Sequence, residues 1–218
     1  MPQMGKDSNK GVLGRFFDLL SGKPEEEDGE QSPGREPTPG LHAPTVEGPK
    51  DLLFVQNFTR NGGRFLYCDE AEEVYRFLAL IASESGIDKM LCFDPAMQSI
   101  LHKFGGLTLF SKETEKCDAF FLGCEFLVSF NGGIMISDRQ TLERKLEDLP
   151  PVFVVLARTS QLTDNLSSGL TGIRMRYAGN LPSQITTIKG PREAEKVEGN
   201  APQACRKEIY LLLLEDQT

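Results

Sequence analysis

Glu125 is the residue whose type and position most directly suggest acid–base or nucleophilic chemistry. It lies in the otherwise apolar run CEFLVSF at 124–130. A carboxylate buried in such a run must be paired or have a shifted pKa, as carboxylates at catalytic sites often do. On an exposed strand end it would be an ordinary surface acid, and the sequence leaves both alternatives open. Cys124 could be a nucleophile, but its apolar neighbours favour a buried structural thiol.

Loops beside the predicted strands supply candidates for ligand binding. Residues 130–133 (FNGG) would let a ligand approach the backbone closely, although Asn-Gly is equally typical of a hairpin turn. Residues 158–161 (RTSQ) directly follow the apolar run VFVVLA. Hydroxyl and free N–H groups there suit an anion such as phosphate or carboxylate, and the alternative is an ordinary helix cap. Residues 61–64 (NGGR) and 189–192 (KGPR) by themselves are typical of plain loops.

The site prediction therefore takes Glu125 as the candidate catalytic residue and a set of polar and glycine residues as the candidate ligand-binding residues. The ligand-binding set is Asn131, Gly132, Gly133, Arg158, Thr159, Ser160, Gln161, Gly190, Pro191 and Arg192.

Several familiar chemistries lack the residues they need. The chain has two His, and His42 precedes the predicted domain, so zinc catalysis and a Ser-His-Asp triad are disfavoured. Neither GxGxxG nor GxxxxGK[ST] occurs. The five Cys include no CxxC, which disfavours a disulfide framework, a zinc ribbon and a cluster site. We therefore expect no metal and no cofactor, reduced thiols and a cytoplasmic location.

Alternating helix and strand patterns must position these residues. Helices are predicted over 51–61, 69–85, 95–104 and 162–177, and strands over 64–68, 89–93, 107–110, 134–137, 152–157, 185–188 and 209–214. Residues 117–128 are predicted to mix a short helix with a strand. This alternation predicts an α/β fold, an open and mostly parallel sheet with helices on both faces. The short turn between EFLVSF and IMIS predicts a local hairpin, and therefore a mixed sheet. Ligands of such folds bind at the carboxyl ends of strands.

The chain divides into three predicted segments. Residues 1–21 contain an amphipathic helix with Val12, Phe16 and Leu20 on one face. Residues 22–49 are rich in Pro, Gly and Glu, as disordered linkers are. The folded domain is predicted over 50–218. The formal net charge of −8 (24 basic against 32 acidic residues) disfavours nucleic acid, and no apolar run suits a membrane span.

Five motifs resemble the LUD domain family (lactate utilization protein C-like, DUF162), in the form found in Bacteroidetes. They are NFTRNGGRFLYC (57–68), CEFLVSFNGGIMIS (124–137), LPPVFVVLARTSQL (149–162), ITTIKGP (185–191) and KEIYLLLLED (207–216). The resemblance covers 50–216. It implies a fold like that of the NagB/RpiA/CoA-transferase group. It also implies an accessory role in oxidation of L-lactate to pyruvate, with iron–sulfur lactate-utilization subunits as partners.

The sequence also departs from the family pattern. Phe130 and Asn131 stand where the family usually has an acid and a Thr, and after Gly190-Pro191 the polar residues do not match in register, whereas Thr159-Ser160-Gln161 is intact. Three hypotheses follow. The protein is an accessory member that binds a small anionic ligand, an isomerase or CoA-transferase-like enzyme using Glu125, or a non-catalytic interaction protein. In the third case the N-terminal helix docks on a partner, which includes the possibility of a homo-oligomer.

Overall fold

A computed structural model describes residues 49–104, 108–110, 116–191 and 207–216. The predicted N-terminal helix at 1–21 and nearly all of the linker at 22–49 lie outside these residues, as does Arg192. The first described element, helix α2, begins at Lys50. In the described part of the chain, every helix is too short or too polar to span a bilayer.

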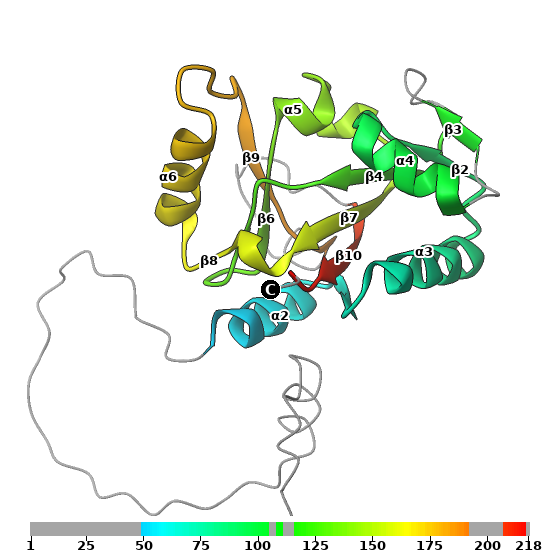
Figure 1. Ribbon diagram of the computed structural model, residues 1–218, viewed down its shortest axis with the longest axis horizontal. Helices are drawn as coiled ribbons and strands as arrows, with labels where there is room; N and C mark the ends of the chain where they lie inside the picture. Colours follow the sequence, from blue (N-terminus) through cyan, green and yellow to red (C-terminus); the bar gives the residue numbers. More distant parts are fainter. Residues whose placement is uncertain (1–48, 105–107, 111–115, 192–206, 217–218) are drawn as a thin grey trace, which may run out of the picture. The chain divides into compact units, whose positions relative to one another are not determined.

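Helices and strands alternate through the domain (Figure 1). The helices are α2 (Lys50–Arg60), α3 (Ala71–Ser85), α4 (Pro95–Phe104), α5 (Asp138–Thr141) and α6 (Leu166–Arg176), with 3-10 turns η1 (Leu146–Asp148) and η2 (Thr159–Gln161). The strands are β1 (Arg64–Cys68), β2 (Lys89–Leu91), β3 (Thr108–Phe110), β4 (Ala119–Gly123), β5 (Phe126–Val128), β6 (Gly133–Ser137), β7 (Val152–Arg158), β8 (Leu162–Thr163), β9 (Ile185–Ile188) and β10 (Glu208–Leu214).

The strands form two sheets. Six of them make a parallel sheet in the order β1-β10-β7-β4-β2-β3. The other four make a mixed sheet in the order β8-β5-β6-β9, in which β5 and β6 form the predicted antiparallel hairpin. The parallel α/β architecture predicted from the sequence is therefore confirmed, with the hairpin placed in a second sheet.

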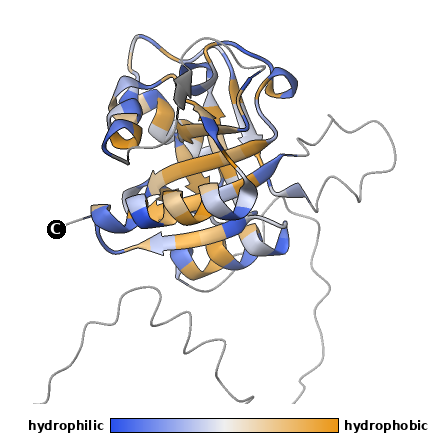
Figure 2. Ribbon diagram, turned by 90° about the vertical axis from the view of Figure 1, so that its right-hand side faces the viewer, coloured by the Kyte–Doolittle hydropathy of each residue, from blue (hydrophilic) through white to orange (hydrophobic). Residues whose placement is uncertain are grey.

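Both faces of the parallel sheet are buried, which explains its continuous apolar strands. Val154, Phe121 and Leu212 face α3 and α4 in one hydrophobic cluster. The alternate residues of the same strands, such as Phe153 and Phe120, are also fully buried and meet edge-to-face at 5.5 Å between ring centroids. Figure 2 shows the apolar strands lying between helices whose colours alternate, as amphipathic helices require.

Two local predictions were wrong. Residues 117–128 contain no helix and instead form β4 and β5, because this segment passes from one sheet to the other. The helix predicted from Leu162 begins at Leu166, because Leu162–Thr163 pairs with β5 as β8. Asn165 then caps α6 by accepting a hydrogen bond from the Ser168 N–H at 3.0 Å.

Candidate functional site

The parallel sheet changes connection direction between β2 and β4. After β2 the chain returns through α4 to β3 on one side, and after β4 it continues toward β7 on the other. Because β2 and β4 are paired neighbours, this is a topological switch point, where the loops leaving the two strands diverge and open a crevice. The segments that follow these strands begin with Cys92 and Cys124.

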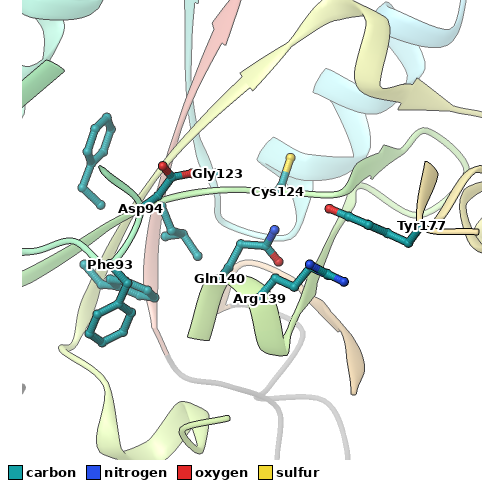
Figure 3. A pocket seen from close by; sticks show the side chains of 10 residues that line it. Phe93, Asp94, Gly123, Cys124, Arg139, Gln140 and Tyr177 are labelled. Atoms are coloured by element: carbon teal, nitrogen blue, oxygen red, sulfur yellow. The ribbon is translucent and has the colours of Figure 1, made fainter. Parts of the chain in front are cut away.

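A pocket with a cavity volume of about 230 Å³ lies at this switch point. Its lining comes from the end of β2, from β4 with Cys124, from α5 and from the residue after α6. These residues are Phe93, Asp94, Phe120, Phe121, Leu122, Gly123, Cys124, Arg139, Gln140 and Tyr177. Figure 3 shows Arg139 and Tyr177 on one side of the pocket, Asp94 near Gly123 on the other, and Gln140 between them.

The cationic side of the pocket is built by Arg139 and Tyr177. The Arg139 guanidinium lies 4.3 Å from the centre of the Tyr177 ring and donates to the Asn180 carbonyl at 2.6 Å. No carboxylate forms an ion pair with Arg139 among the residues that the structure describes. A guanidinium held in this way retains donors and charge for an anion.

Glu125 lies behind the pocket and has no exposed surface. Its Oε1 accepts hydrogen bonds from Ser137 Oγ at 2.8 Å and Gln140 Nε2 at 3.0 Å. Its Oε2 accepts from Arg176 Nη1 and Tyr177 Oη, both at 3.1 Å. The carboxylate is therefore buried and paired, one of the two alternatives left open by the sequence. It orients two residues that line the pocket, Gln140 and Tyr177, and is not itself among the lining residues.

Burial affects two further titratable groups near Glu125, Tyr177 and Cys124. It raises the pKa of Tyr177, an effect that the negative charge of Glu125 reinforces. Burial also raises the pKa of the Cys124 thiol to about 12, so Cys124 is protonated at neutral pH and a poor nucleophile. This agrees with its interpretation as a structural thiol. The described residues include no group of three or more His, Cys, Asp or Glu that could hold a metal ion.

Gln161 joins the two places where the chain passes between sheets. Strand β5 follows β4 after Cys124 and Glu125, and β8 follows β7 after Thr159–Gln161, so two parallel neighbours bend together. The bend frees backbone carbonyls, which need donors. Gln161 Nε2 donates to the Cys124 carbonyl at 2.6 Å and to the Glu125 carbonyl at 3.3 Å. Gln161 therefore holds the segment that carries Glu125.

The rest of the 158–161 cluster already binds an anionic group of the same chain, the carboxylate of Asp216. The Ser160 N–H donates to Asp216 at 2.7 Å, Thr159 Oγ1 at 3.2 Å, and Arg158 forms an ion pair at 3.4 Å. Hydrogen bonds from Ser160 are the largest cause of a lowered Asp216 pKa, followed by those from Thr159 and the charge of Arg158. The cluster has the anion-binding chemistry that the sequence predicts, and binding of an external ligand there stays a prediction.

The pKa of Asp216 predicts a pH dependence of stability. A carboxyl group whose pKa falls below its ordinary 3.8 on folding stabilises the fold above about pH 4, and this contribution is lost as the pH falls through the folded pKa. Asp216→Asn should therefore lower the urea midpoint at pH 7 and reduce the further loss between pH 5 and pH 3. The control is Asp69→Asn at an exposed position, which should leave the pH dependence of the urea midpoint unchanged. If Asp216→Asn and Asp69→Asn gave the same pH dependence, the assignment to Asp216 would be contradicted.

Residues 131–133 and 190 come together away from this cluster, around the end of α2. Asn61 Nδ2 donates to the Asn131 carbonyl at 2.8 Å, and Asn131 Oδ1 accepts from the Gly133 N–H at 2.9 Å. A side chain at Gly190 would overlap the backbone of the 61–63 loop. The glycines therefore allow segments of the chain to approach one another. Ligand binding by these residues and by Pro191 also stays a prediction.

The pocket residues Asp94, Arg139, Gln140 and Tyr177 are absent from the site predicted from the sequence. Two of them had a signal in the sequence, a polar residue just after a predicted strand, as at 158–161. Asp94 directly follows a predicted strand, and Arg139 comes two residues after another. Tyr177 carries no such signal, because it reaches the pocket from the far end of α6.

Comparisons with known proteins agree with this architecture. A solved structure, the crystal structure of a DUF162 family protein from Deinococcus radiodurans at 1.70 Å resolution, aligns with a TM-score of 0.54 and 15% sequence identity. The alignment covers 75% of this chain and 94% of that chain, and at this identity it shows the fold alone. No curated protein matches the chain.

The family model for the LUD domain matches residues 53–214, which include both sheets and every residue that lines the pocket. LUD domains are associated with lactate utilization proteins. The match extends over most of the chain and begins within α2, so it covers nearly the whole described domain. The chain therefore belongs to the LUD domain family.

Proposed function

We propose that this LUD-domain protein is an accessory component of an L-lactate oxidation system with iron–sulfur partner subunits, and that it binds a small anionic ligand in the switch-point pocket. The observation that carries the proposal is the position of that pocket, at the carboxyl ends of β2 and β4 with Arg139 in its wall. Ligands of open α/β sheets bind at such positions. The redox step is assigned to the partners.

The charge and size of the pocket support a small anion. Arg139 offers a cation, while Arg176 is engaged by Glu125 in the buried ion pair. The volume of about 230 Å³ is below the range of roughly 300–1,000 Å³ typical for drug-sized ligands. A short carboxylic acid therefore suits the pocket better than a nucleotide or coenzyme A.

Glu125 has a positioning role in this proposal. It has no exposed surface and accepts hydrogen bonds from four side chains, so it would have to break these contacts to act on a substrate. Its effect on a ligand passes through Gln140 and Tyr177. This arrangement favours ligand binding over the isomerase or CoA-transferase-like alternative, in which Glu125 is the acid–base or nucleophilic group.

Removal of the Arg139 charge tests the proposal. Thermal unfolding of the full chain is measured with increasing lactate, pyruvate and phosphate. A ligand at about 100 times its Kd adds about 2.7 kcal/mol of stability, a rise of roughly 5–10 °C for a domain of this size. Arg139→Gln should abolish the rise, because the guanidinium is the anchor for the anion.

Arg174 provides a matched control, since it is exposed on α6 and lies outside the pocket lining. Arg174→Gln should keep the ligand-induced rise seen in the parent protein. A rise that survives Arg139→Gln, or the absence of any rise with all three anions at millimolar concentration, would refute ligand binding in this pocket.

A further inference from the structure

We propose that Asp94 makes the pocket selective for small carboxylic acids that also carry a hydrogen-bond donor, a hydroxyl or an ammonium group, directed away from the carboxylate. This inference rests on the proposed function, in which Arg139 anchors the carboxylate, and adds the chemical class of the ligand. It concerns the wall of the pocket opposite Arg139, where Figure 3 shows Asp94 near Gly123.

The position of Asp94 is fixed by the fold. The residue follows β2 directly and precedes Pro95, the first residue of α4. Its Oδ1 accepts a hydrogen bond from the Ala96 N–H at 2.8 Å, as the side chain of a helix cap does. The carboxylate is therefore held at the switch point rather than free to rotate into solvent.

The second oxygen of Asp94 is available to a ligand. In the described part of the chain no hydrogen bond or ion pair reaches Oδ2. Asp94 is exposed and lines the pocket. An ionised carboxylate only accepts hydrogen bonds, so the group that it recognises must be a donor.

Arg139 and Asp94 give the pocket opposite charges on opposite sides, with Gln140 between them (Figure 3). The lining also has an apolar part, which includes Leu122 and the edge-to-face pair Phe93 and Phe120, 5.3 Å apart between ring centroids. A ligand that matches has a carboxylate at one end, a short carbon skeleton, and a hydroxyl or ammonium donor toward Asp94. A second carboxylate or an oxo group at that end would bring an acceptor oxygen against the Asp94 carboxylate with no proton to form a hydrogen bond, so such a ligand should bind less tightly.

The expected selectivity is about tenfold, because a hydrogen bond to a charged group is lost when the donor is removed, and the site is open enough for water to replace part of it. A more enclosed site would discriminate more strongly. Hydroxyl and ammonium groups can both donate a hydrogen bond to the Asp94 carboxylate, and the titrations described next distinguish between them.

Calorimetric titration of the full chain with matched acids tests the inference. At three carbons the ligands are L-lactate, L-alanine, pyruvate and propionate, and at four carbons they are 4-hydroxybutyrate, 4-aminobutyrate and butyrate. We expect a donor-bearing acid of at least one length to bind about tenfold more tightly than its matched acid without a donor. The length that shows the preference reports the span between Arg139 and Asp94, and the better of its two donors identifies the ligand class.

Asp94→Asn isolates the charge, since asparagine also caps helices well and keeps the Ala96 contact. The preference for acids with a donor should fall to about twofold or less. The affinity for pyruvate should rise, because the amide can donate a hydrogen bond to its oxo group. Asp88→Asn is the control. Asp88 is exposed at the opposite end of the same strand, and its replacement should leave every affinity unchanged.

The outcomes separate this inference from the proposed function. If the acids bind through Arg139 but donors bring no advantage at either length, or the advantage survives Asp94→Asn, the role of Asp94 is refuted and the anion site stands. If none of the acids binds, both the proposed function and this inference are overturned.

Discussion

Replacing Glu125 by alanine is expected to lower the free energy of unfolding by about 3–5 kcal/mol, mainly because its hydrogen-bond donors lose a charged acceptor. Arg176 is 40% exposed in its side chain and can be rehydrated. Ser137 and Gln140 lose the acceptor that each reaches within 3.0 Å. Each hydrogen bond to a charged group contributes about 1.5–3 kcal/mol, which accounts for the size of the expected loss.

Equilibrium urea unfolding measures this change, and Glu84→Ala is its control. Glu84 is exposed on α3, and within the described residues its side chain makes no hydrogen bond or ion pair. The Glu84→Ala change should therefore stay within about 0.5 kcal/mol. Glu125→Gln keeps the volume and one acceptor oxygen and should fall between the two. A Glu125→Ala variant as stable as the Glu84→Ala variant would show that the buried carboxylate does not hold the second sheet and α6 together.

Replacing Gly132 by alanine should cost about 2–5 kcal/mol, the second large effect. Gly132 has φ = 63°, a left-handed conformation that costs other residues about 1–2 kcal/mol. An added Cβ would also lie 2.5 Å from the Asn57 carbonyl carbon and 2.8 Å from Phe58 Cα. Because these are backbone atoms of α2, the helix and the hairpin must move apart, at about 1–3 kcal/mol more.

Gly86→Ala separates these two costs. Gly86 has nearly the same φ, 62°, but no atom lies within 4 Å of its added Cβ. It should lose about 1–2 kcal/mol, the conformational cost alone. Equal losses for the two variants in urea unfolding would mean that α2 does not pack against the 131–133 turn as closely as the structure shows.

Much of the local structure could be predicted from the sequence. The apolar run at 152–157 is a strand because its alternate side chains meet two different buried layers, and Pro95 begins a helix where it was expected. The hairpin between β5 and β6 was predictable from FNGG, since its turn requires a left-handed glycine. These signals come from residues that are neighbours in the sequence, so they can be read without knowing the rest of the fold.

The chemistry predicted at single residues was less specific. A buried and paired Glu125 was one stated alternative, but its donors lie 12 to 52 positions along the chain. The anion-binding character of 158–160 was also predictable, whereas its partner, Asp216, lies 56 positions from Ser160. The residue types show which groups hydroxyl and N–H donors can bind. Which residue lies within reach of them depends on the tertiary structure.

The sequence by itself determined the order of helices and strands, the hairpin and the parallel α/β class, because hydrophobic periodicity and turn chemistry act over a few residues. Only the tertiary structure decided that the strands divide into two sheets and that the chain reverses its direction of connection beside β2. That reversal brings Asp94, Arg139 and Tyr177 to one pocket. Strand pairing depends on how much apolar surface the whole domain buries, and this cannot be read from the pattern of any single segment.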